Sequence, residues 1–335
     1  MAQSQRRPSK TWSLLGDVRR RPTPYEVTAA KFSYHFRREP APFEMNPQAP
    51  FNQYYLEHRE GSPFQVDDWE GFRDPAKLTY ADYVTLQHDR ETYVDILTDH
   101  HEAAESASGL SAGWVATLRE LFIPLRFPLH VLQMVGLYVG QMAPAAYITN
   151  CAHFQAADEL RRIQRFAYHT RALANAHGAE LAETATARDA WEHATAWQPL
   201  RQALETLLTE RDWGQAFVAL NLVLKPALDA VVNDQLDALA ALNGDEYLSL
   251  LLAEFQQDSE RSRAWTVALV TYALSRDPSV GDVVRTWTAK WQPMAEAAVS
   301  GLAALFAGAP HPIEPAAVEA AATATCDAES AAAGL

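Results

Sequence analysis

The sequence predicts an all-α protein in which long helices form an antiparallel bundle. Glycine is scarce, at 14 of 335 residues, and alanine, leucine, glutamate and arginine dominate after residue 75, which favours helix. Helical periodicity persists over runs of about 25 to 30 residues with short connections between them, the pattern of a bundle. No β pattern competes with it. Two long hairpins, near residues 114–175 and 213–275, suggest the two halves of a four-helix core.

The first 75 residues form an extended arm that differs from the rest of the chain. Prolines at positions 8, 22, 24, 40, 42, 47, 50 and 63 exclude long helices there. The arm is also too rich in aromatic side chains for a solvated tail, so it must lie on the surface of its own domain or of another subunit. Aromatic enrichment is an interface signature and favours the second option. The candidate interface residues are Trp12, Tyr25, Phe32, Tyr34, Phe36, Tyr54, Tyr55 and Trp69.

A helical domain is expected over residues 76–306. Asp74 can cap its first helix, and Pro75 suits the first helical position. The expected helices cover residues 80–105, 114–141, 148–175, 187–210, 213–242, 245–275 and 280–306. Residues 307–335 are rich in alanine, proline and acidic residues and are expected to be a frayed, flexible tail.

The charge of the chain limits its partners. The formal net charge of −14 argues against nucleic acid and against an anionic membrane surface. It fits plain solubility or the docking of a basic partner protein. The longest apolar run, residues 131–147, contains two glutamines and a proline, so it predicts a buried core helix and not a membrane span.

The cysteines and the N-terminus indicate a cytoplasmic protein. Cys151 and Cys326 lie far apart in the sequence and define neither a disulfide framework nor a zinc site, which suits a reducing compartment. The first ten residues are polar and basic without an apolar core, so they do not resemble a secretory signal.

The run from Gln155 to Arg162 looks like a metal-binding helix that has lost its histidine. Carboxylate-bridged di-iron proteins carry Glu-x-x-His on a bundle helix, so that a carboxylate and an imidazole face the same metal. Here Glu159 is followed three residues later by Arg162, whose fixed positive charge cannot ligate iron. We expect these two side chains to form an ion pair.

The other ligand positions of such a bundle are altered as well. Residues 121–157 contain no Asp or Glu, so Tyr138 or a neighbour is expected at the inward position of that helix. Lys225 stands where a bridging glutamate would be needed. Ser259 and Ser262 occupy the two ligand positions of a run similar to Gln-x-Asp-Glu-x-Arg-His. We therefore predict that this chain has no metal, catalytic or cofactor-binding residue.

Other groups of residues in the sequence give weaker evidence for a functional site. The run Asp-His-His-Glu at 99–102 resembles a metal cluster, but adjacent residues of a helix point in different directions. His130, His153 and His169 lie on apolar helices and are interpreted as hydrogen-bonded core or interface residues. There is no glycine-rich phosphate loop and no Gly-x-Ser-x-Gly elbow.

Several short motifs are spread from about residue 10 to residue 295. They are Thr11-Trp12-Ser13, Arg21-Pro22-x-Pro24-Tyr25-Glu26, Tyr54-Tyr55 before Ser62-Pro63, Asp67-x-Trp69-x-x-Phe72-x-Asp74-Pro75, Leu78-x-Tyr80-x-x-Tyr83, Gln141-Met142-Ala143-Pro144, and Asp212-Trp213-Gly214-x-Ala216-Phe217-Val218-x-Leu220-Asn221. Jointly they resemble the β (small) hydroxylase subunit of bacterial multicomponent monooxygenases, and most closely the toluene, alkene and isoprene branch.

The resemblance implies a ferritin-like helical bundle, similar to that of ribonucleotide reductase, and a set of partners. In that family an α subunit carries the di-iron centre, and the β subunit is a degenerate paralogue whose arm embraces α. Two α, two β and two γ chains form the hydroxylase. A reductase with FAD and a 2Fe-2S centre, an effector protein and sometimes a Rieske ferredoxin complete the NADH-dependent system.

The expected role is a non-catalytic, metal-free β subunit that supports the α subunit and the (αβγ)2 assembly. The complete enzyme would use O2 and NADH to epoxidise an alkene or hydroxylate an aromatic ring, with toluene, isoprene and propene all open as substrates. Two alternatives are a self-sufficient ferritin-like di-iron oxidase and a stand-alone helical binding protein.

Overall fold

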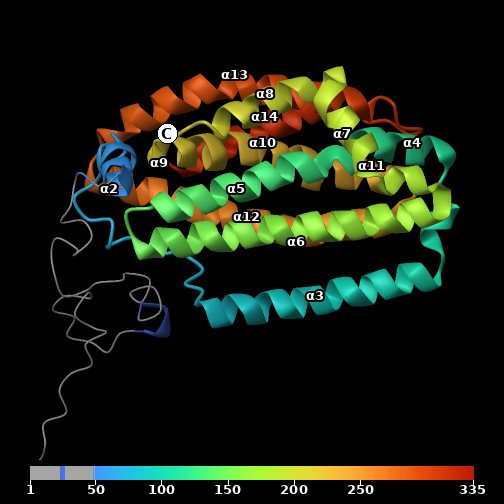
Figure 1. Cartoon of the computed structure of the whole chain (residues 1–335), viewed down its shortest axis with the longest axis horizontal. Coiled ribbons are helices and arrows are strands. Elements are labelled where there is room, and N and C mark those ends of the chain that lie inside the picture. The colour runs from blue at the N-terminus through green and yellow to red at the C-terminus, as the bar shows by residue number, and fades with distance from the viewer. Residues whose placement is uncertain (1–22, 27–47, 49) are drawn as a thin grey trace, which may run out of the picture.

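The structure, a computed structural model, describes residues 23–26, 48 and 50–335. No strand occurs among these residues, and the all-α prediction is confirmed. The helices form an elongated bundle with α3 (Tyr80–Ala103) along one edge and α13 (Val280–Phe306) along the opposite edge (Figure 1). Between these edges run the long helices α5 (Arg126–Met142), α6 (Ala146–His177) and α12 (Glu246–Arg276).

Shorter elements complete the bundle. They are α2 (Pro50–Tyr55) with a π turn at Leu56–Glu60, α4 (Ala112–Leu121), α7 (Thr184–His193), α8 (Gln198–Leu207), α14 (Pro315–Ala332), and 3₁₀ turns at Ser106–Gly109, Ile123–Leu125, Ala179–Ala182 and Thr195–Trp197.

One continuous helical rod, from Trp213 to Leu242, forms the centre of the molecule. It consists of α9 (Trp213–Phe217), a π turn (Val218–Leu224), α10 (Lys225–Asp229), a second π turn (Ala230–Gln235) and α11 (Leu236–Leu242). Every residue from 213 to 233 is buried. A helix that is apolar on nearly all sides can be stable in water only in such a central position.

Two of the described helical stretches are long and apolar enough to cross a membrane. They are Ala112–Met142 and Trp213–Leu242. The bundle buries 61% of the apolar window of the first and 100% of that of the second. Both therefore have the burial expected of core helices.

Local capping fixes where the long helices begin. Thr79 and Asp82 form a reciprocal capping box at the start of α3, in which each side chain accepts a hydrogen bond from the other residue's backbone N–H. Asp245 caps α12 by accepting from the backbone N–H of Leu248 at 3.1 Å. Helix α6 stops at Gly178, whose φ of 135° is open to glycine and strained for other residues.

Two predicted helices are broken in the structure. The predicted helix 114–141 divides into α4 and α5, because Pro124 lies in a 3₁₀ turn between them and cannot donate a helical hydrogen bond. The predicted helix 187–210 divides into α7 and α8, and Pro199 occupies the first turn of α8. Prolines therefore set both breaks.

The prediction of a frayed, flexible tail over residues 307–335 is wrong for most of its length, because residues 315–332 form α14. Pro315 fits the first helical position, and alanine is the strongest helix former. Val318 and Ala322 are buried where α14 packs on α13 and α10. The small side chains that suggested low complexity let these helices approach closely.

The described part of the arm packs on the helices of its own chain. The rings of Phe64, Trp69 and Trp213 pack together in a triangle, with centroids 5.3 to 5.4 Å apart. Tyr25 packs against Tyr147 and accepts a hydrogen bond from the backbone N–H of Asp74 at 3.2 Å.

This packing shows that the interface prediction is wrong for two of the candidate residues. Tyr25 and Trp69 are 5% and 7% exposed within this chain alone, so neither is free to face another subunit. Tyr54 and Tyr55 are half-buried. The remaining candidates, Trp12, Phe32, Tyr34 and Phe36, lie outside the described residues.

Candidate functional site

Four charged side chains form a closed ring of ion pairs in the middle of the bundle. Lys225 Nζ lies 2.6 Å from Glu159 Oε1 and 2.6 Å from Asp229 Oδ2. Arg162 closes the ring, with Nη2 2.6 Å from Glu159 Oε2 and Nη1 2.9 Å from Asp229 Oδ1. Each carboxylate oxygen therefore faces one cation. The predicted Glu159–Arg162 ion pair is confirmed as part of this larger ring, which we call the charge ring.

The central rod supplies a polar residue at every fourth position, namely Asn221, Lys225, Asp229 and Asn233. All four bind side chains of α6 or α12. In a regular α-helix, residues four apart drift by about 40°, or about 120° over three such steps. Each of the π turns before and after α10 has more residues per turn than an α-helix. It therefore rotates the following residues in the opposite direction. The two π turns thus keep the four polar residues on one face.

The two serines at the altered ligand positions act as hydrogen-bond partners. Asn233 Nδ2 donates to Ser259 Oγ at 2.8 Å, and Ser262 Oγ donates to Gln155 Oε1 at 2.7 Å. The same Gln155 oxygen accepts from Trp265 Nε1 at 3.0 Å. Ser259 and Ser262 therefore connect α12 to the rod and to α6 and satisfy buried amides.

The charge ring has two positive and two negative members, so its net charge is zero. Burial by itself raises the pKa of Asp229, but the charges of Lys225 and Arg162 outweigh it and lower that pKa to about 2. Burial by itself lowers the pKa of Lys225 and of Arg162, and the neighbouring carboxylates reverse this and raise both. Asp229, Lys225 and Arg162 therefore remain charged at neutral pH.

The residues of the charge ring do not fit a metal ion. Both oxygens of Glu159 and of Asp229 already bind cationic nitrogens, and the two cations would repel a metal. The adjoining cavity, with a volume of about 10 Å³, has room for about one water molecule. Within the described ranges, no three or more His, Cys, Asp or Glu side chains gather in a way that could hold a metal.

The expectation that Tyr138 or a neighbour occupies the inward position is wrong for Tyr138, which does not join the charge ring. Its hydroxyl donates to the carbonyl of Arg211 and lies 2.8 Å from the hydroxyl of Tyr54. The face of α5 that meets α6 is made of small residues: a Cβ added to Gly136 would lie 3.4 Å from Ala156 Cβ. The two helices are too close for a tyrosine between them.

The histidines singled out from the sequence form no metal-binding group among the described residues. His169 is buried with Nε2 4.0 Å from Asp245 Oδ2, and burial lowers its pKa. His101 Nδ1 lies 3.0 Å from Ser106 Oγ. His153 is half-buried, and His130 is exposed.

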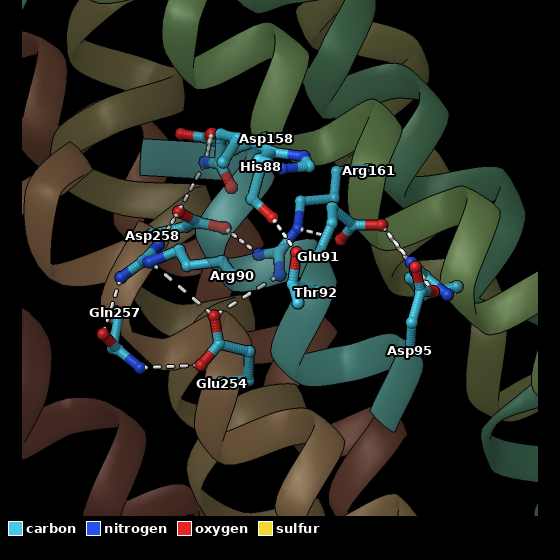
Figure 2. Close-up of polar contacts among 12 residues, drawn as sticks. His88, Arg90, Glu91, Thr92, Asp95, Asp158, Arg161, Glu254, Gln257 and Asp258 are labelled. Carbon is cyan, nitrogen blue, oxygen red and sulfur yellow. Dashed lines mark hydrogen bonds and ion pairs between the residues drawn. The ribbon is translucent and has the colours of Figure 1, made fainter. Parts of the chain in front are cut away.

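A second charged network joins α3, α6 and α12, and the sequence reasoning missed it (Figure 2). Asp258 of α12 accepts hydrogen bonds from Arg90 of α3, from Arg161 of α6 at 2.7 Å and from Arg261 of its own helix at 2.9 Å. Arg161 also donates to Glu91 of α3 at 2.5 Å. Opposite charges three residues apart on α6 and α12 were the signal that could have revealed it.

Asp158 connects this network to Tyr83 and Gln87 of α3. Its Oδ1 accepts from the Tyr83 hydroxyl at 2.8 Å and from Gln87 Nε2 at 2.7 Å, and the same amide nitrogen lies 3.0 Å from Asp258 Oδ1. Burial and the charge of Asp258 raise the pKa of Asp158 to about 7, although Arg261 and Tyr83 act in the opposite direction. Gln87 thus bridges two carboxylates that repel each other.

Helix α3 exposes four large apolar side chains. Tyr80 and Ile96 are 65% and 64% exposed, and Val84 and Tyr93 are each 46% exposed. On α6, Leu160 is 44% exposed. Large apolar side chains gathered on one exposed helix are typical of a contact surface with another protein.

Buried polar layers thus join α3, α6, the central rod and α12, and comparison with known proteins gives the class of this bundle, that of the hydroxylase components of di-iron monooxygenases. The methane/phenol/alkene hydroxylase family matches residues 54–277. The chain therefore belongs to this family.

One relative and its solved structure specify the subunit. The chain is 38% identical over 299 residues to the hydroxylase component subunit beta of the toluene-4-monooxygenase system from Ectopseudomonas mendocina, covering 89% of this chain and 90% of the relative. A solved structure of toluene 4-monooxygenase, with toluene bound in the resting active site, contains a chain that matches with a TM-score of 0.83 at 37% identity. That match covers 90% of this chain and 99% of the other. The protein is a β subunit of a multicomponent monooxygenase, as the motifs predict.

The chain also resembles more distant proteins, by sequence in one comparison and by fold in the other. The chain is 26% identical over 252 residues to the phenol 2-monooxygenase oxygenase component DmpL from Pseudomonas sp. (strain CF600), covering 75% of each chain. It resembles a solved phenol hydroxylase from Pseudomonas sp. OX1 with a TM-score of 0.82 at 20% identity, over 94% of this chain and 92% of that one, which shows the common fold. The ferritin-like prediction is confirmed.

Proposed function

We propose that this chain is the metal-free, non-catalytic scaffold of its hydroxylase and that the di-iron centre lies in the partner α subunit. The charge ring supports this proposal, because Lys225 and Arg162 occupy both carboxylates that could otherwise bind metal. In this role the chain holds α in place and contributes no atom to the reaction.

The proposed assembly contains two copies each of α, β and γ. Electrons travel from NADH through a reductase with FAD and a 2Fe-2S centre, with an effector protein and a ferredoxin as further components. The complex resides in the cytoplasm. The net charge of −14 supports protein partners and gives no support to nucleic acid or membrane binding.

The substrate we propose is a small hydrocarbon, either an aromatic such as toluene or an alkene such as isoprene or propene. The relative with 38% identity belongs to a toluene-4-monooxygenase system. In the reaction one oxygen atom of O2 enters the hydrocarbon, and the other leaves as water with two electrons from NADH and two protons. Co-expression of the chain with its neighbouring subunits, followed by assay for phenol and epoxide products, tests this substrate class.

Iron analysis tests the scaffold role and one rival. The chain purified alone should contain no stoichiometric iron, whereas the assembled hydroxylase should contain it. About two iron ions per isolated chain would identify a self-sufficient di-iron oxidase. An Arg162→His variant should still bind no iron, since Lys225 continues to occupy Glu159 and Asp229.

Assembly tests the other rival, a stand-alone binding protein. We propose the exposed apolar side chains of α3 as a contact with α, and an Ile96→Asp variant should lose co-purification with α while keeping its helix content. Leu242, 55% exposed at the end of α11, provides the matched control Leu242→Asp. If both variants assemble normally, α3 is not the interface.

The N-terminal arm is the second proposed contact with α. Phe64 and Trp69 belong to the core of this chain, so removal of all 75 residues would damage the fold. A chain lacking residues 1–22 avoids that damage, because it keeps Phe64, Trp69 and the buried Tyr25. It should remain helical by circular dichroism and fail to form the complete complex on size exclusion; recovery of a normal complex would contradict the proposal.

A further inference from the structure

A buried carboxylate on α14 has no hydrogen-bond partner among the residues that the structure describes. Glu329 of α14 is 5% exposed, and neither of its carboxylate oxygens has a hydrogen-bond partner within the described part of the chain. A buried carboxylate in this situation is strongly unfavourable in its ionised form, whereas the protonated acid is much less so. The site therefore favours a neutral Glu329.

The charged groups around Glu329 do not reverse its preference for the protonated form. Burial raises the pKa of its carboxyl to about 8; Arg263 of α12 and Lys225 of α10 oppose the rise, and Asp229 of α10 adds to it. Lys225 and Asp229 are already paired in the charge ring. The π turn before α10 contains no ionisable side chain.

The other elements packed on α14 carry further acidic groups. The π turn after α10 contributes Asp234, whose pKa burial also raises. Burial raises the pKa of the neighbouring Cys326 thiol to about 12, and Glu329, Asp327 and Glu296 of α13 add to the rise.

Helix α14 also forms one wall of a cavity of about 470 Å³. Leu222 and Ala227 of the central rod line its inner side, Val299 of α13 lines another, and α14 contributes Ala322 and Cys326. If α14 moves away, the cavity loses this wall and the apolar side of the rod at Leu222 and Ala227 becomes exposed to solvent.

We propose that α14 is a proton-coupled strap, which docks on the central rod while Glu329 is protonated and loosens when Glu329 releases its proton to water. The step breaks the carboxylic O–H bond, and the resulting carboxylate regains its hydration outside the bundle. No other group is needed for the balance.

The direction of the pH dependence follows from linkage. Undocked Glu329 has an ordinary pKa of 4.5, and docked Glu329 has a pKa of about 8. Below the lower value both forms hold the proton, and docking is strongest. Between the two values the docked form binds the proton more tightly, so docking weakens by up to about tenfold per pH unit. Above the higher value the dependence levels off.

Amide hydrogen exchange on the full chain tests the proposal. A released α14 has 18 residues and no packing partner, so it should fray and lose protection. Protection of α14, corrected for the intrinsic exchange rate, should fall by up to about tenfold per unit between pH 5 and pH 8, while α6 stays protected. Glu329→Gln and the apolar Glu329→Met should both abolish this dependence and strengthen protection at pH 8.

Asp327 supplies the control, because it is an exposed acid two residues away on the same helix. Asp327→Asn should keep the pH dependence of the unaltered chain. If the protection of α14 in the unaltered chain does not change with pH, the proposal is overturned. A pH dependence that persists in both Glu329 variants would overturn it as well.

Discussion

Lys225 and Asp229 lie one turn apart on α10 and contact each other at 2.6 Å, yet each also binds the opposite charge on α6. Lys225 reaches Glu159, and Asp229 reaches Arg162. The rod and α6 thus exchange two ion pairs of opposite polarity, which fixes their relative register. The arrangement is stable only when complete, since loss of one member leaves an unpaired charge in the core.

Removal of Lys225 should therefore destabilise the chain strongly. A Lys225→Met variant leaves two carboxylates against Arg162 alone, and we expect the free energy of unfolding to fall by about 3–5 kcal/mol. Urea denaturation followed by circular dichroism measures this. The double variant Lys225→Met/Asp229→Leu keeps the neutral Glu159–Arg162 pair and should recover part of the loss. A double variant less stable than the single one would contradict this account.

Acid should weaken the fold through Asp229. Its pKa is about 2 in the folded chain, below the ordinary 3.8, so its contribution is present above about pH 4 and disappears as the pH falls towards 2. The contribution amounts to roughly 2 kcal/mol. Urea denaturation at pH 2 to 5 should show a shallower acid loss in an Asp229→Asn variant. Identical slopes in the two proteins would rule out this role.

Loss of one charge from the network between α3, α6 and α12 should also destabilise the fold. Asp258→Asn takes away the charge shared by Arg90, Arg161 and Arg261, and we expect a loss of about 2–4 kcal/mol in thermal or urea unfolding. The exposed Arg276–Asp67 pair is the comparison, because Arg276→Ala should leave stability nearly unchanged. Equal effects of the two substitutions would show that burial does not determine the strength of these pairs.

The contact between the arm and the rod depends on Gly214. A Cβ added there would lie 2.6 Å from Phe64 Cβ, so Gly214→Ala should lower stability by about 1–3 kcal/mol. Gly109 has no atom within 4 Å of an added Cβ, and Gly109→Ala should be nearly neutral. Thermal melts of the two variants measure the difference. Similar melting temperatures would mean that the arm shifts freely.

Local relationships in this chain are readable from its sequence, because helical spacing determines them. The Glu159–Arg162 pair is three residues apart on one helix, and its prediction needs nothing beyond that spacing. The contact between Lys225 and Glu159 joins residues 66 positions apart and depends on how the helices pack. The two π turns that bring Lys225 into place were not predicted, although Pro226, which cannot donate a helical hydrogen bond, is the second residue after the first of them.

The errors have physical causes as well. Pro124 marks the break between α4 and α5, but an apolar run on both sides favoured one continuous helix. Tyr138 was placed by the position of an absent ligand, whereas the close approach of Gly136 to α6 excludes a large residue there. The alanine content of residues 315–332 is typical of both low-complexity chain and tightly packed helix, and only the neighbouring surfaces of α10 and α13 decide between them.

The neutrality of the charge ring also separates this chain from iron-binding sequences by more than one mutation. A neutral histidine in place of Arg162 would leave Glu159 and Asp229 sharing the single cation Lys225. A glutamate in place of Lys225 would set three carboxylates against one guanidinium. Each single substitution towards a set of metal ligands thus leaves unequal positive and negative charge in the core. This makes the loss of metal binding difficult to reverse.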